Sequence, residues 1–64
     1  MAIFVLIERN TGKHIAAYGE VDPSRFEVGR LHREKRRRYQ VTELIPPSRS
    51  TPTPTFRVVV EQLQ

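Results

Sequence analysis

The sequence predicts an α+β fold in which one helix covers one face of a small antiparallel sheet. Three observations support this class: an apolar N-terminal run followed by a turn, a helix-start signature at Asp22 and Pro23, and two later segments of strand composition. The expected order is ββαβ with one further strand. A chain of 64 residues forms one domain at most, and only 38% of its residues are apolar. The core is therefore thin.

The N-terminal third predicts a β-hairpin. Residues 2–7, AIFVLI, are β-branched and aromatic and too few for a helix, so they indicate a central strand. In the RNTGK that follows, Asn10 and Thr11 suit the middle of a type I turn, and Gly12 suits the position with positive φ. The prediction is a three-residue loop with a bulge, in which Arg9 opposes Lys13.

This pairing divides the hairpin into two faces. The face expected to form the core carries Ile3, Val5, Ile7, Ile15 and Ala17. The opposite face carries Phe4, Leu6, Ala16 and Tyr18. The small residues on the first face leave room for a helix to pack closely.

Residues 25–37 are expected to form that helix. Asp22 can accept hydrogen bonds from the first free backbone N–H groups, and Pro23 suits the first helical position. Most residues that follow are good helix formers, and acids and bases recur at favourable spacings. The apolar stripe is weak, and Gly29 costs ~1 kcal/mol relative to Ala.

The alternative is an all-β fold, a small barrel or sandwich with a basic hairpin tip. Residues 26–31 are then a strand, and a second hairpin turns at Glu34 and Lys35. These two residues are poor turn formers, and a tight register would oppose Arg33 to Arg36, which is repulsive. The helix is therefore favoured.

The C-terminal half contains two strand-like segments separated by a linker. Residues 39–45 alternate enough to form a strand, so residues 1–45 make one small domain. Residues 46–55, PPSRSTPTPT, predict an extended linker. Residues 56–64 return to strand composition and either pack back on the sheet or are exchanged with a partner chain. The apolar side chains that exchange would bury are Phe56, Val58 and Val60.

All of the net positive charge lies in one segment. The chain carries a net charge of +4 from 11 basic and 7 acidic residues. Residues 30–38 hold six basic residues and one acid, a net of +5, and the rest holds five basic and six acidic residues, a net of −1. A neutral protein with a single basic block has one place where anions would bind.

This basic block is the candidate binding site, and nucleic acid is its expected partner. The planar fork of Arg binds phosphate in bidentate fashion, and clustered arginines can follow a nucleic-acid backbone. An aromatic at the end of the run could stack on a base, but packing in the core is favoured. The expected nucleic-acid or anion-binding residues are Arg30, Arg33, Lys35, Arg36, Arg37, Arg38 and Tyr39.

The function expected from these features is that of a small non-enzymatic regulatory protein that binds DNA or RNA with little sequence readout. The alternative is a protein-binding adaptor or inhibitor that docks the basic block on an acidic surface of a larger machine, such as the transcription apparatus. A chain of this size would suit a virus-encoded modulator of that kind. A protein partner predicts an apolar anchor such as Phe56 or Val58. A homo-oligomer formed by exchange of the C-terminal strand is also expected.

Catalysis and metal binding have little support in the sequence. There is no Cys, only one Asp, and no phosphate-loop or nucleophile motif. His14 and His32 lie far apart without a carboxylate spaced as a co-ligand, so neither a metal nor a cofactor is expected. The apolar run at residues 2–7 is too short for a signal peptide and far short of the ~20 residues of a membrane span. A cytoplasmic location is expected, or a nuclear one in a eukaryote.

Overall fold

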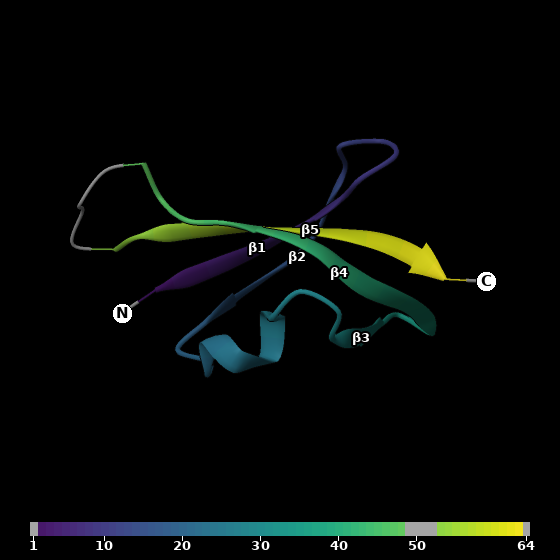
Figure 1. Cartoon of the computed structure of the whole chain (residues 1–64), viewed down its shortest axis with the longest axis horizontal. Helices are drawn as coiled ribbons and strands as arrows, with labels where there is room; N and C mark the ends of the chain where they lie inside the picture. Colours follow the sequence, from purple (N-terminus) through teal and green to yellow (C-terminus); the bar gives the residue numbers. More distant parts are fainter. Residues whose placement is uncertain (1, 49–52, 64) are drawn as a thin grey trace.

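Five strands form one curled sheet in the computed structural model, which describes residues 2–48 and 53–63 (Figure 1). The strand order across the sheet is β2-β1-β5-β4-β3, with β5 parallel to β1 and antiparallel to β4. The chain runs through β1 (Ile3–Glu8), β2 (His14–Gly19), the 3₁₀ turn η1 (Pro23–Phe26), β3 (Leu31–Glu34), β4 (Arg37–Ile45) and β5 (Thr55–Leu63).

The helix expected over residues 25–37 does not form, so the α+β prediction is wrong. The helix-start signature is used: Asp22 accepts a hydrogen bond from the Ser24 N–H at 3.0 Å, but it caps only the short η1. The backbone is already extended at Glu27 and takes a φ of 94° at Gly29. The weak apolar stripe noted in the sequence gives a longer helix too little surface to bury, and the chain enters β3 instead.

β3 and β4 form the second hairpin that the all-β alternative predicted, but its turn lies one residue later than expected. Lys35 and Arg36 occupy the two loop positions with φ of 49° and 66°, the signs that a type I′ turn requires. Glu34 therefore opposes Arg37, and Arg33 opposes Arg38 instead of Arg36, so one pair of arginines is still opposed. The result is nearly all sheet, curled into a half-barrel rather than a closed barrel or a sandwich.

The N-terminal hairpin keeps the predicted register away from its turn. Val5 opposes Ala17 as expected. The loop itself is one residue longer, because the Glu8 N–H donates to the Lys13 carbonyl at 2.9 Å. A bulge after Leu6 absorbs the difference.

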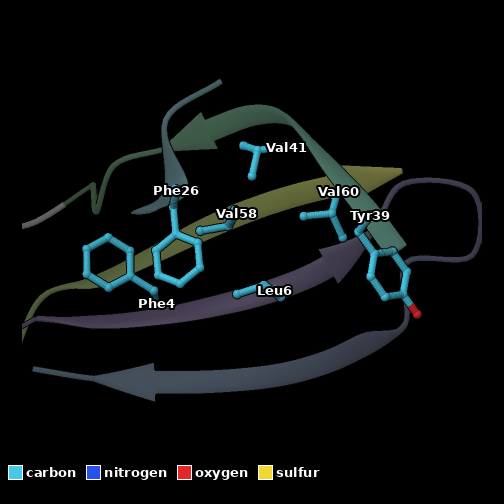
Figure 2. Close-up of a cluster of buried hydrophobic side chains, with 7 residues drawn as sticks. All are labelled: Phe4, Leu6, Phe26, Tyr39, Val41, Val58 and Val60. Atoms are coloured by element: carbon cyan, nitrogen blue, oxygen red, sulfur yellow. The ribbon is translucent and has the colours of Figure 1, made fainter. Parts of the chain in front are cut away.

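The core lies on the face opposite to the one predicted. On this inner face η1 inserts Phe26, whose ring centroid lies 5.1 Å from that of Phe4. The predicted core residues Ile3, Val5 and Ile7 point outward and are half-buried. The bulky aromatics of β1, β5 and η1 decide between two faces that are both apolar. The buried core consists of Phe4, Leu6, Phe26, Tyr39, Val41, Val58 and Val60 (Figure 2).

The C-terminal strand fills a central place in its own sheet. β5 lies between β1 and β4, with Val58 and Val60 fully buried and Phe56 stacked on Phe4 at a centroid distance of 4.9 Å. The strand begins at Thr55, within the segment expected to be a linker, and residues 49–52 of that segment lie outside the described ranges. Exchange of β5 between chains stays a prediction.

Candidate anion-binding surface

The basic block lies on one hairpin, and all six of its cations are exposed. We call residues 30–38 the basic hairpin. Its turn carries two of the cations, and the others lie along or just before the strands. In chain order the six are Arg30 before β3, Arg33 within β3, Lys35 and Arg36 at the turn, and Arg37 and Arg38 at the start of β4.

Strand alternation divides these cations between two sides of the hairpin. Arg33 and Arg38 are directly opposed on the outer face, because the neighbouring His32 is buried on the inner one. Lys35 and Arg37 instead line an open pocket of about 300 Å³ together with residues of the first hairpin. Arg33 and Arg38 are both exposed on the outer side of the hairpin, where a phosphate can approach their guanidinium groups.

Tyr39 lines the same pocket as Lys35 and Arg37, but its side chain is buried. It is 3% exposed and belongs to the core, the placement favoured from the sequence. The two residues expected as anchors for a protein partner are also engaged, Val58 in the core and Phe56 against Phe4. The apolar side chain exposed within the basic hairpin is Leu31, at 70%.

A larger open pocket, of about 640 Å³, adds a cation that the sequence pattern missed. We call it the arginine pocket. Arg25 comes from η1, Arg30 from the loop before β3, and Arg33 from β3 itself. Nothing in the sequence joins Arg25 to the basic block, because the link depends on how η1 folds over the sheet. The residues that line the pocket are Tyr18, Arg25, Gly29, Arg30, Leu31, His32 and Arg33.

Three polar side chains connect the two edge strands of the sheet. Tyr18 on β2 donates a hydrogen bond to the carboxylate of Glu34 on β3. His32 Nε2 lies 3.3 Å from Glu34 Oε1 and 3.4 Å from the Tyr18 hydroxyl, and the His32 ring meets the Tyr18 ring edge-on. This cluster was not predicted, because its members are polar and come from strands at opposite edges of the sheet.

The cluster fixes the charge of the one acid in the basic hairpin. The hydrogen bond from Tyr18, followed by that with His32, lowers the pKa of Glu34. The same hydrogen bond to Glu34 is the main reason that the pKa of Tyr18 is raised. Glu34 is therefore ionised at neutral pH and held by Tyr18 and His32 on the inner side, turned away from the outward pair of arginines.

No family model, no curated protein and no solved structure matches the chain. Across residues 2–48 and 53–63, no helix is long and apolar enough to cross a membrane. The same ranges contain no group of three or more His, Cys, Asp or Glu side chains that could hold a metal ion. What the protein does is therefore inferred from the charge, exposure and geometry of its own residues.

Proposed function

We propose that the protein is a non-enzymatic regulatory protein that binds nucleic acid through the basic hairpin and the arginine pocket. It recognises the phosphate backbone and reads little base sequence. The observation that supports this most strongly is the exposure of all six cations of the basic hairpin while Glu34, its one acid, is engaged on the inner side. We place this binding in the cytoplasm, or in the nucleus of a eukaryotic cell.

The shape of the basic hairpin suits this ligand. The major groove of B-form DNA admits a two-stranded β-ribbon. β4 is paired with β5 from Arg38 onward, so the part of the basic hairpin that could enter the groove is its tip, residues 34–37. Its arginines can grip phosphates in bidentate fashion along the groove edge. Arg25 and Arg30 extend the positive surface from the ribbon into the arginine pocket.

The turn of the basic hairpin also supports a role for its side chains. Type I′ turns favour Asn-Gly, because both residues need a positive φ. An ordinary L-residue pays roughly 1–2 kcal/mol for the left-handed conformation, and Lys35 and Arg36 both adopt it. Strained backbone of this kind concentrates at functional sites. Two cations at this turn are expected where their charge contributes to binding.

The test is a titration of the protein with random-sequence duplex DNA and with single-stranded RNA at two salt concentrations. If all six cations meet phosphates, log K for the duplex falls with log salt with a slope of about −5, which weakens binding about 10³-fold between about 50 and about 200 mM salt. Arg36→Gln should reduce this slope by about 1. Arg9→Gln, an exposed cation in the first hairpin loop, is the matched control and should leave the slope unchanged. Absence of binding to either nucleic acid at low salt would refute the proposal.

An acidic protein surface is a second candidate partner, favoured by Leu31. An exposed leucine beside Arg30 and Arg33 provides the apolar anchor that a protein hot spot needs. Leu31→Ser separates the two candidates. It removes no charge, so it should leave the salt slope of duplex binding unchanged. A protein partner anchored on Leu31 would lose at least tenfold in affinity.

A further inference from the structure

The outer face of the sheet carries five apolar side chains although nothing in the described part of the chain packs on them. We call the side chains Ile3, Val5, Ile7, Ile45 and Val59 the outer apolar face. All five are half-buried by their neighbours in the sheet, and none belongs to the core or to the partly buried residues packed against it. The core side chains in Figure 2 and the turn η1 lie on the inner face.

Strand register brings most of these side chains into neighbouring rows. β1, β5 and β4 are adjacent, so residues in register form rows across the sheet. The parallel pairing of β1 with β5 and the antiparallel pairing of β5 with β4 give two neighbouring rows. One row consists of Ile7, Val59 and Glu43, and the next consists of Val5, Arg57 and Ile45.

Such a face is unusual for a sheet in contact with water. A sheet with one face on the core and one in solvent alternates apolar with polar residues. Here the outward positions of β1 are all β-branched and apolar, as in a strand buried on both faces. Contiguous apolar surface rimmed by polar residues marks an interaction site.

We propose that the outer apolar face is covered by the same face of a second copy, giving a two-fold symmetric dimer in which the two sheets pack face to face. The charges on this face identify the occupant. The two rows carry one cation, Arg57, and one anion, Glu43, so they are neutral, whereas Arg33 and Arg38 lie apart from them on the same side of the sheet. The net +5 of residues 30–38 lies at the β3 end of the sheet. Two copies therefore approach through this face without the repulsion that their basic hairpins would cause.

The rows are complementary to themselves. A two-fold axis that runs across the strands between the rows places Val5 of one copy over the partner's Ile7. It also brings Arg57 of each copy beside the partner's Glu43. Val59 and Ile45 then lie over the aliphatic parts of the partner's Arg57 and the partner's Glu43, and each charge has its opposite on the neighbouring strand. Burial of this face would also add to the thin core of a 64-residue chain.

Sedimentation over a concentration series, without nucleic acid, tests the proposal independently of the proposed function. The native protein should form a dimer, and Val5→Lys should weaken association by at least tenfold. Val28→Lys is the matched control, because Val28 is 65% exposed and lies outside the outer apolar face. It should leave the dimer unchanged. Folding of each variant is checked by its NMR spectrum.

A charge-swap cycle gives a second, milder readout. Arg57→Glu and Glu43→Arg should each weaken the dimer, and the double variant should recover most of the loss. A native monomer up to millimolar concentration would overturn the proposal, as would a dimer that Val5→Lys and Val28→Lys affect equally. The proposal would also be overturned by a monomer that uses this face for a different protein. Mixed dimers should form rapidly from labelled and unlabelled copies, whereas formation as slow as unfolding would indicate exchange of β5 instead.

Discussion

Replacing the turn of the basic hairpin should stabilise the protein and weaken its binding at the same time. In Lys35→Asn with Arg36→Gly, both positions keep the positive φ of the native turn, 49° and 66°, but use residues that favour it. Relief of roughly 1–2 kcal/mol at each position is partly offset by up to ~1 kcal/mol of extra chain entropy that Gly has in the unfolded state. The net gain is about 1–3 kcal/mol, which corresponds to a rise in Tm of about 4–24 °C for a domain of this size.

Thermal and urea unfolding measure this gain, and Lys35→Gln with Arg36→Gln is the control. The control removes the same two charges without relieving the backbone, so its stability should stay well below that of the Asn-Gly variant. Both double variants should lose about 2 units of salt slope in duplex binding, because two phosphate contacts are lost. The reasoning is refuted if the Asn-Gly variant is no more stable than the Gln-Gln control.

Three further predictions test the cluster of Tyr18, His32 and Glu34, the core, and the loop before β3. Tyr18→Phe should make the free energy of unfolding, measured with urea, depend less on pH at both the acid and the alkaline end. The lowered pKa of Glu34 gives stability that is lost as pH falls below the ordinary value of 4.5. The raised pKa of Tyr18 gives stability that is lost as pH rises above 10.0. An unchanged profile would exclude the hydrogen bond. Val58→Ala should cost about 2–3 kcal/mol and the outward Val59→Ala less than about 1 kcal/mol in the monomer; equal costs would mean that the two faces are wrongly assigned. Gly29→Ala should lower the free energy of unfolding by roughly 1–2 kcal/mol, seen as a lower Tm, because the φ of Gly29 is 94°. A Cβ there would meet no atom within 4 Å, so this cost comes from the backbone alone. A neutral result would contradict that backbone conformation.

The sequence predicts local structure well where turn chemistry is distinctive. The first hairpin is recognised from its Gly12 turn, and only its loop length differs. The second hairpin is missed because Lys35 and Arg36 are unfavourable turn residues, while Asp22 and Pro23 are favourable helix starters. Tertiary pairing of β4 with β5 outweighs both local preferences.

The choice of core face is a different kind of failure. β1 is apolar on both sides, so alternation alone does not show which side meets η1. The predicted pairing of Val5 with Ala17 is confirmed, yet both residues face outward. The outward side chains of β1 are as apolar as its inward ones, which is expected if the proposed dimer buries the outer face as the core buries the inner one.

The candidate site also has one part that the sequence predicts and one part that only the fold brings together. The basic hairpin is visible in the sequence because its cations are contiguous, and the structure leaves all six exposed. Arg25 and the cluster of Tyr18, His32 and Glu34 are not visible, since they are brought together only when the sheet curls and its edges approach. Contiguous sites can be found from sequence, whereas sites assembled across the fold require the fold.

The claim that the basic hairpin binds a phosphate backbone is tested most directly by NMR of the arginine side chains. A short random-sequence duplex is added at low salt, and the Nε–Hε signal of each arginine is followed. The signals of Arg33, Arg36 and Arg38 should shift together and return as salt is raised, while that of Arg9 stays in place. Unchanged signals in the basic hairpin, or equal shifts at Arg9, would contradict the claim.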